Sequence, residues 1–516
     1  MRPLRAARLW SALPWFVALA VAGSCKAREA TPGGPATSSD GRAPGAPPSS
    51  SAPTAPAPPP GTLRYRVSDA ASGAPIPCKL TFVATPPHPR PFGNGDVPLV
   101  MGDAVAGAGR VFSLAGEGAL DVPKGRYEVV ITRGPEWTLE RREVVVSDAP
   151  STLEASLTHV IDTTGWLSGD FHVHAEPSWD SSVPLAARVR EFAAEGVDLL
   201  VATDHNLVTD YAPVIAELHA EALLASIPGS ELTTHAWGHF GAFPLGAEAR
   251  SWPVMRGTMI QDGTAKSVLG DARARAPDVF LTANHPRLPG MGYFDIGELD
   301  RRTGKLVREG ATDAIDALEV LNGYQDPDEA ILDTLMADWL SLLDAGNRVA
   351  GLGNSDTHHL SNNLAGYPRN YLALADDRPA AVRAEAVTGA LRAGKVLFTT
   401  GPFVRLSVEG AGLGETAVVG PKARGHLAVD AAPWVDVTRV TLYLGSRITQ
   451  RWAVPPGTAT RRFEVDFTVD GTKPTYVLAR VEGTRSLGPS VGEEGQFTVR
   501  PVAVTNPVYL RPRAAK

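Results

Sequence analysis

The sequence is poor in cysteine, in excess positive charge and in long apolar runs. Its two cysteines, Cys25 and Cys78, are too few for a disulfide framework or a sulfur-rich metal site. A formal net charge of −7 provides no attraction toward nucleic acid, so we expect no nucleic-acid partner. The apolar run at residues 9–22 would be about 21 Å long as a helix, too short to cross a hydrocarbon core of about 30 Å.

The N-terminus has the pattern of a targeting segment. Three arginines precede the apolar run, which ends in small residues and then Cys25, so we predict a signal peptide over residues 1–25. The ending Ala-Gly-Ser-Cys resembles the lipobox of bacterial lipoproteins, in which the cysteine carries lipid. A plain signal peptidase site is the alternative. The resemblance implies that lipid on Cys25 attaches the chain to a membrane of the cell envelope, and Lys26 favours the outer membrane or a position facing the periplasm.

The remaining 491 residues (516 less the first 25) are enough for about three domains. Residues 26–60 are rich in Ala, Pro, Ser and Gly and are expected to form a disordered linker. Residues 61–160 contain short alternating runs separated by Gly and Pro, and resemble a carboxypeptidase-regulatory-like β-sandwich. Residues 403–510 show the same pattern of short alternating runs, which predicts a second sandwich of immunoglobulin-like size.

The region between these two sandwiches, residues 165–402, has a different pattern. Strand-like runs at 198–202, 279–283, 317–321 and 349–353 alternate with amphipathic helical stretches. This alternation predicts an α/β fold, either a barrel or a doubly wound sheet.

The segment GDFHVHAEPSWD contains the first candidate metal ligands of that region. His172 and His174 are two residues apart on a predicted strand, so both imidazoles leave the same face. Two such rings can bind one metal ion. Asp180 follows six residues later, where the chain has left the strand and can turn a carboxylate back toward the histidines.

Further histidines and carboxylates follow other strand-like runs, and nine of the twelve histidines lie between residues 166 and 402. Because the carboxyl ends of strands in an α/β barrel meet at one rim, we expect these side chains to converge. His235 is an alternative to His239, although the Gly-His-Phe setting favours His239. The candidates are Asp204, His205, Glu231, His239, His285, Asp356 and His358.

These motifs resemble those of the PHP superfamily, named for polymerase and histidinol phosphatase. The matching segments are HVH at 172–174, DHN at 204–206, NHP at 284–286 and SDTH at 355–358. Glu231 in GSEL matches the bridging carboxylate of that family, and the segments GSELTT and VLFTTGPFV are similar to its CehA-like branch. The resemblance covers residues 165–402 and implies a distorted (β/α)7 barrel.

The resemblance also implies a cluster of two or three divalent metal ions. One ion would bind His172, His174, Glu231 and Asp356. A second ion would share Glu231 and also bind His239 and His285. A third ion would bind Asp180, His205 and His358. Mixed histidine and carboxylate ligands suit Zn²⁺, Mn²⁺ or Fe²⁺. A carboxylate that bridges two ions brings them to about 3.5–4 Å, where a bridging water becomes a hydroxide nucleophile near neutral pH.

Two residues beside the ligands are candidates for catalysis. Asp204 precedes His205 and can orient a ligand or accept a proton. Arg287, two residues after His285, has a forked guanidinium suited to holding an anionic substrate, as does Arg369. A structural ion pair at the rim is the alternative for both arginines.

The sequence therefore predicts a metal-dependent hydrolase, in the first place a phosphoesterase for mono- or diesters. Its substrate would be a small or polymer-linked ester, anionic in character. Two alternatives stay open at this point. The same site can hydrolyse a carboxylic ester, carbamate or amide, or the chain can be a surface binding protein in which the metals are structural.

Overall fold

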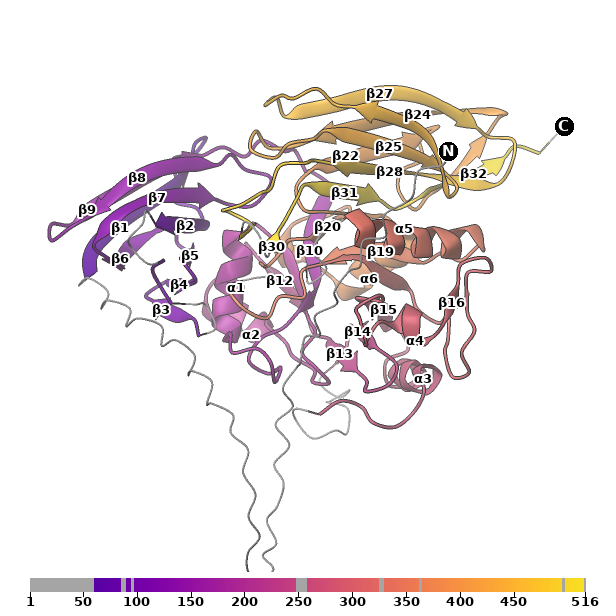
Figure 1. Ribbon diagram of the computed structural model, residues 1–516, viewed down its shortest axis with the longest axis horizontal. Coiled ribbons are helices and arrows are strands. Elements are labelled where there is room, and N and C mark those ends of the chain that lie inside the picture. Colours follow the sequence, from indigo (N-terminus) through magenta and orange to yellow (C-terminus); the bar gives the residue numbers. More distant parts are fainter. Residues whose placement is uncertain are drawn as a thin grey trace, which may run out of the picture. The chain divides into compact units, whose positions relative to one another are not determined.

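A computed structural model describes residues 60–84, 90–93, 97–246, 258–323, 329–361, 364–493 and 497–514 (Figure 1). These residues all belong to one compact unit, Ala57–Lys516. The predicted signal peptide with Cys25, and residues 26–59 of the predicted linker, lie outside the described residues. Within the described part, no helix is long and apolar enough to cross a membrane.

The N-terminal β region consists of two sheets that share one apolar core. One sheet has the strand order β6-β1-β9 and the other β3-β4-β5-β2-β7-β8. Along β1 the alternate residues Leu63, Tyr65 and Val67 are buried, as the period of two requires. Cys78 is a buried free thiol in this core. The strands are β1 (Pro60–Asp69), β2 (Cys78–Ala84), β3 (Leu99–Met101), β4 (Ala104–Gly107), β5 (Arg110–Ser113), β6 (Glu117–Pro123), β7 (Gly125–Thr132), β8 (Glu140–Val146) and β9 (Ser151–Leu157).

The central region supplies strands to two further sheets. In the first, β12, β11 and β10 are parallel, and β20 and β21 continue the sheet in antiparallel pairing. The second has the order β13-β14-β15-β18-β19, antiparallel up to β15 and parallel beyond it. The first-sheet strands are β10 (Trp166–Val173), β11 (Leu199–Ala202), β12 (Ala225–Ile227), β20 (Arg369–Ala373) and β21 (Val396–Thr399). The second-sheet strands are β13 (Ser230–Thr233), β14 (His239–Phe243), β15 (Phe280–Asn284), β18 (Ala317–Asn322) and β19 (Ala350–Asn354).

Two isolated bridges connect the central sheets. One joins Val173, at the end of β10, to Thr357, and the other joins His205 to Glu231. The carboxyl ends of β10, β11 and β19 are thereby brought to the start of β13. This junction is where the predicted site residues lie.

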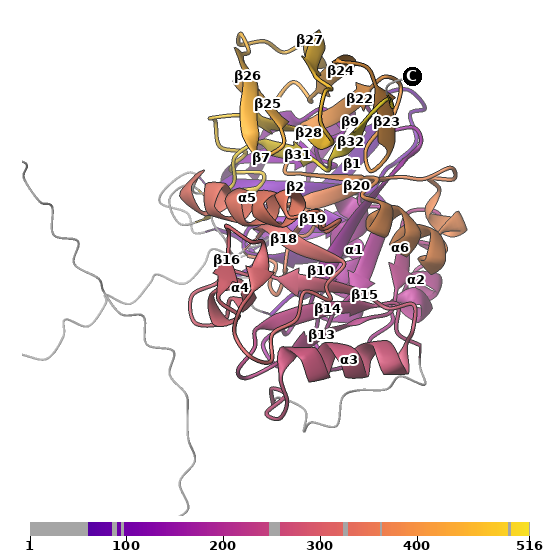
Figure 2. The same ribbon diagram turned by 90° about the vertical axis from the view of Figure 1, so that its right-hand side faces the viewer.

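Six α-helices are present in the described residues. They are α1 (Leu185–Ala194), α2 (Ala212–Glu217), α3 (Ala265–Arg275), α4 (Tyr293–Ile296), α5 (Glu329–Asp344) and α6 (Ala384–Ala393). Leu335 and Trp339 are buried on one face of α5 and share a core with Leu478 of the C-terminal region. Figure 2 shows α5 between the central strands β18 and β19 and the C-terminal strands.

The predicted distorted (β/α)7 barrel is wrong. In the described residues strands account for 43% and helices for 14%, and no sheet closes on itself. A β/α barrel needs a helix between successive parallel strands, whereas β13, β14 and β15 pair antiparallel, as do β20 and β21. The alternation of strand-like and helical runs located most strands, but it does not reveal whether neighbouring strands are parallel or antiparallel.

The C-terminal β region extends the first central sheet. β21 pairs with β31, and the sheet continues through β28 and β25 to β26; β32 also pairs with β28, and β23 pairs with β32. A separate sheet has the order β22-β24-β27 and packs in the same large core. The strands are β22 (Phe403–Val408), β23 (Thr416–Val419), β24 (Lys422–Asp430), β25 (Arg439–Leu444), β26 (Arg447–Ala453), β27 (Arg461–Asp470), β28 (Thr475–Glu482), β31 (Val502–Thr505) and β32 (Val508–Pro512). Two short hairpins complete the described strands: β16 (Leu299–Asp300) with β17 (Lys305–Leu306), and β29 (Gly492–Glu493) with β30 (Phe497–Thr498).

Buried polar contacts tie the N-terminal β region to the central region. Lys79 on β2 forms a fully buried ion pair with Glu195, the residue that ends α1. Arg133 donates hydrogen bonds to the carbonyl oxygens of Pro77 and Ala193, each at 2.9 Å. Because breaking a buried pair by removing one partner is strongly destabilising, these contacts fix α1 and the strand ends beside it.

Candidate metal centre

All nine predicted ligands come together at the junction of the two central sheets. His172 lies on β10 and His174 directly follows it, while His205 follows β11. Glu231 lies on β13 and His239 begins β14. His285 directly follows β15, Asp356 and His358 follow β19, and Asp180 lies in the loop after β10.

Glu231 is the centre of this cluster. One carboxylate oxygen, Oε1, lies 3.1 Å from His172 Nε2 and 3.4 Å from both His239 Nδ1 and His285 Nε2. The other, Oε2, lies 2.8 Å from His205 Nδ1. The Glu231 side chain is 1% exposed, so four imidazoles surround a carboxylate that is shielded from bulk solvent.

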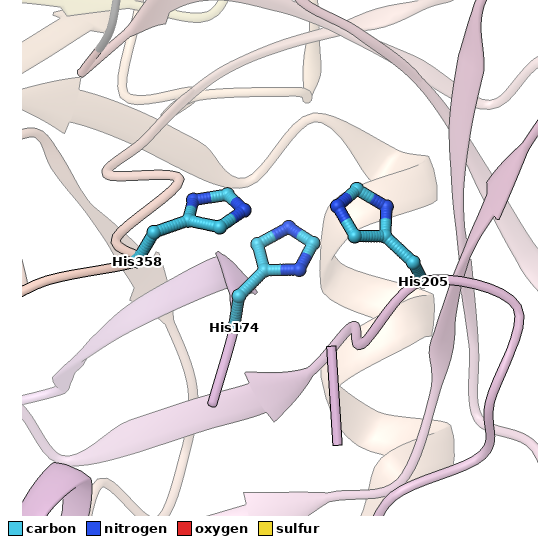
Figure 3. A group of neighbouring side chains, drawn as sticks. All are labelled: His174, His205 and His358. Carbon is cyan, nitrogen blue, oxygen red and sulfur yellow. The ribbon is translucent and has the colours of Figure 1, made fainter. Parts of the chain in front are cut away.

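Two aspartates connect the remaining histidines. Asp356 Oδ1 lies 3.2 Å from His172 Nε2 and 3.3 Å from His174 Nε2. Asp180 contacts His205 Nε2 at 3.1 Å and His358 Nε2 at 3.4 Å. The ring centroid of His174 lies 4.0 Å from that of His358 and 4.4 Å from that of His205. Figure 3 shows these three rings grouped together.

Hydrogen bonds behind the rings fix their orientation. His174 Nδ1 donates to Ser178 Oγ at 2.9 Å, and Ser178 in turn donates to Asp204 at 2.6 Å. His205 Nδ1 lies 2.6 Å from Thr233 Oγ1, and His358 Nδ1 donates to a backbone carbonyl at 2.9 Å. In His174 and His358 the Nε2 atom is therefore left facing the cluster, as in metal-binding histidines whose other nitrogen is hydrogen-bonded. Both ring nitrogens of His205 face ligand carboxylates, Nδ1 toward Glu231 and Nε2 toward Asp180.

Glu319 is a buried residue of the site that the sequence reading missed. Its Oε1 accepts from His172 Nδ1 at 2.8 Å and from Asn354 at 2.9 Å, and its Oε2 accepts from the backbone N–H of His285 at 2.7 Å and from Asn322 at 2.8 Å. It lies in the middle of β18, in the run Ala-Leu-Glu-Val-Leu-Asn, where every residue is buried. A lone carboxylate inside an apolar strand was the available signal, because a buried acid needs a partner.

Three residues of the site have left-handed backbone conformations that non-glycine residues rarely adopt. Their φ angles are 56° for Asn206, 30° for His285 and 53° for Asp356. Such conformations cost on the order of 1–3 kcal/mol each and persist where surrounding contacts enforce them. Each residue donates its backbone N–H to another residue of the site: Asn206 to the Glu231 carbonyl at 2.8 Å, His285 to the Glu319 carboxylate at 2.7 Å, and Asp356 to the His172 carbonyl at 2.9 Å.

Carboxylates raise the pKa of some histidines of the cluster, whereas burial lowers the pKa of His174 and His239. Burial would lower the pKa of His172, but neighbouring carboxylates, Asp356 first among them, hold that pKa well above its usual range. Burial is likewise outweighed at His205, where Asp180 and Glu231 raise the pKa to about 10. Burial would raise the pKa of Glu231, but the surrounding histidines hold it well below its usual range. The site thus favours positive charge, which protons or metal cations can supply.

The donor atoms fit a metal ion. Two ligands each about 2.1 Å from one ion lie at most about 4.2 Å apart, and the nitrogen–oxygen separations around Glu231 and Asp356 fall within that span. Among the described residues, no hydrogen-bond partner is found for either ring nitrogen of buried His239 or for Nδ1 of buried His285. Buried histidine, aspartate and glutamate side chains can therefore hold a metal ion in this protein.

The structure places the other candidates outside this cluster. Asp204 accepts hydrogen bonds from Ser178 and from the backbone of Ala175, so it acts on His174 only through Ser178. Arg287 forms a bidentate ion pair with buried Asp338.

Arg287 also pairs with Asp295, whereas Arg369 donates to the backbone carbonyls of residues 195, 196 and 366. His235 is exposed, whereas His239 lies in the cluster.

No family model matches the chain, and no curated protein matches it.

Proposed function

We propose that the chain is a metal-dependent hydrolase in which these nine residues hold two or three divalent ions such as Zn²⁺, Mn²⁺ or Fe²⁺. The observation that carries the proposal is the position of Glu231, which lies within 3.4 Å of four histidine nitrogens. A single carboxylate shared by several histidines suits adjacent ions with a common ligand better than one closed structural site. The motif resemblance to the PHP superfamily supports the same reading.

Each group of residues has a task in this proposal. Bound ions would supply a nucleophile from water near neutral pH and neutralise charge on the attacked atom. Glu319, Ser178 and Thr233 hold the rings of His172, His174 and His205 in position. Asp204 stabilises the turn after β10 through Ser178, so it positions His174 and does not contact substrate.

Solvent access to the cluster supports catalysis over a purely structural role. The Asp180 side chain is 43% exposed, although its carboxylate contacts two histidines of the cluster. A structural site is normally closed by protein ligands, whereas a catalytic site keeps a position open to water or substrate. Among the nine proposed ligands, Asp180 is the one with substantial solvent exposure.

Phosphate mono- or diesters are the proposed substrates. Their non-bridging oxygens carry negative charge and can contact several cations at once. A neutral carboxylic ester offers only one carbonyl oxygen to such a site.

A second candidate is the hydrolysis of a carboxylic ester, carbamate or amide at the same site. The observation that favours it is the engagement of Arg287, whose guanidinium pairs with Asp338 and Asp295. The cation expected from the sequence to hold a phosphate therefore already has carboxylate partners.

Hydrolysis of chromogenic esters by the purified protein, loaded with Mn²⁺ or Zn²⁺, tests the proposal. The panel holds a phosphomonoester, a phosphodiester and a carboxylic ester, with Asp356→Asn as the inactive control. We expect the phosphate esters to turn over faster than the carboxylic ester. Faster turnover of the carboxylic ester would favour the second candidate, and no turnover by metal-loaded protein would favour a binding protein with structural metals.

A further inference from the structure

Among the described ligands of the cluster, the most exposed one lies in the loop after β10. His172 and Glu231 are at most 1% exposed, and His285 is 4% exposed. Asp180, in the loop after β10, is the ligand with substantial exposure. A molecule that reaches the ligands from solvent therefore meets this loop first.

Trp179 precedes Asp180 in that loop and is 38% exposed, a large exposed fraction for a tryptophan. Its ring stacks on His205, with the two centroids 4.1 Å apart and the planes inclined by 18°. Because His205 covers one face of the indole, the exposed area lies on the other face and on the ring edge. A flat apolar surface thus adjoins a ligand of the candidate metal centre.

The loop that carries Trp179 is held at several points. Ser178 bonds to His174 and Asp204, and Ser181 Oγ donates to the backbone carbonyl of His358 at 2.8 Å. The backbone N–H of Glu176 donates to the carbonyl of Val183 at 2.9 Å, which closes the loop. A side chain placed on an ordered loop loses little further freedom when a ligand packs on it.

We propose that Trp179 is a binding platform for the leaving group, and that the preferred substrates are esters with a planar, apolar leaving group such as an aryl group. This inference rests on the proposed function. The ester would lie at the ligands beside Asp180, and the aryl ring would pack on the face of the indole that is turned away from His205. Offset stacking on an indole strengthens binding by about three- to tenfold beyond the area that is buried.

A structural role for Trp179, as a cover for His205, predicts something different. Its removal would then alter metal binding or stability, and would affect aryl and alkyl ligands equally. A platform predicts a change confined to aryl ligands, with metal content unaltered.

Calorimetric binding of two phosphonates to the metal-loaded full-length protein separates these roles, because neither phosphonate is hydrolysed. We expect phenylphosphonate to bind about three- to tenfold more tightly than methylphosphonate. Trp179→Ala should abolish that preference, and Trp179→Phe should retain most of it. The matched control is Trp452→Ala, which removes a half-buried tryptophan that packs on Phe463 in the C-terminal region.

Equal affinity for both phosphonates in the unaltered protein would overturn the platform, as would a preference that survives Trp179→Ala. Loss of metal from Trp179→Ala would also overturn it, in favour of the structural role. Hydrolysis is measured separately. An aryl preference in binding without any ester hydrolysis would support the platform and refute the proposed hydrolase. Hydrolysis without an aryl preference would support the hydrolase and refute the platform.

Discussion

The two halves of the candidate metal centre differ in how the fold supports them. The inner group is His172, Glu231, His239, His285 and Asp356, and the outer group is His174, Asp180, His205 and His358. The inner residues lie on or next to strands. Glu319 bonds to His172 and His285 from behind, and Asn284 donates to the Glu231 carboxylate. The outer group includes Asp180, which lies in the loop after β10 and has an exposed carboxylate.

The difference indicates a division of labour. The inner group is fixed by the sheets before any ligand arrives, so it is expected to hold ions tightly. The outer group is closed from one side by a loop, so its ion can exchange more easily than the inner ions. Residues beside the outer group can contact substrate. Four substitutions test this division, taken from the largest expected effect to the smallest.

Asp356→Asn should have the largest effect, because Asp356 Oδ1 contacts both His172 and His174 and so joins the two groups. We expect hydrolysis of every ester class to fall below detection, measured with the chromogenic panel. Asp278→Asn, an exposed aspartate, is the control. Appreciable residual turnover in the Asp356 variant would mean that Asp356 is not a ligand.

Asp180→Asn should remove one ion and leave the others bound, because Asp180 contacts only His205 and His358 among the ligands. Elemental analysis of the dialysed variant measures this directly. A variant that loses every ion would show that the two groups bind metal as one unit, which would end the distinction between them.

Glu319→Gln should weaken metal binding by about ten- to hundredfold without removing a ligand, since outer partners of metal-bound histidines have effects of that size. The reason is that Glu319 orients His172 and the backbone of His285. Competition with a chelator gives the affinity, and exposed Glu309→Gln is the control. An unchanged metal affinity in this variant would mean that Glu319 contributes to the packing of the core and not to metal binding.

Arg287→Ala should have the smallest effect on catalysis, because its guanidinium is paired with Asp338 and Asp295. We expect a loss of unfolding free energy of about 1–3 kcal/mol, since buried Asp338 keeps only its contact with Arg301. The ratio of phosphate-ester to carboxylic-ester turnover should stay constant. A selective loss of phosphate-ester turnover would instead make Arg287 a substrate contact.

The candidate site was more predictable from the sequence than the fold. The strand period placed His172 and His174 on one face, and the position of His205 and His285 after strand-like runs brought them to the same junction. The barrel was wrong because local patterns do not reveal strand direction, and the β13–β14 hairpin needs no helix. Glu319 was missed because its role depends on β10 and β15 lying beside β18, which no local pattern contains.

The metal content of the purified protein, compared with that of Glu231→Gln, tests the central claim most directly. Glu231 lies within 3.4 Å of four histidine nitrogens, so its carboxylate is expected to serve more than one ion. Elemental analysis should find two or three divalent transition-metal ions in each chain, and the variant should lose more than one of them. A native protein without bound metal, or a variant with full occupancy, would contradict the account.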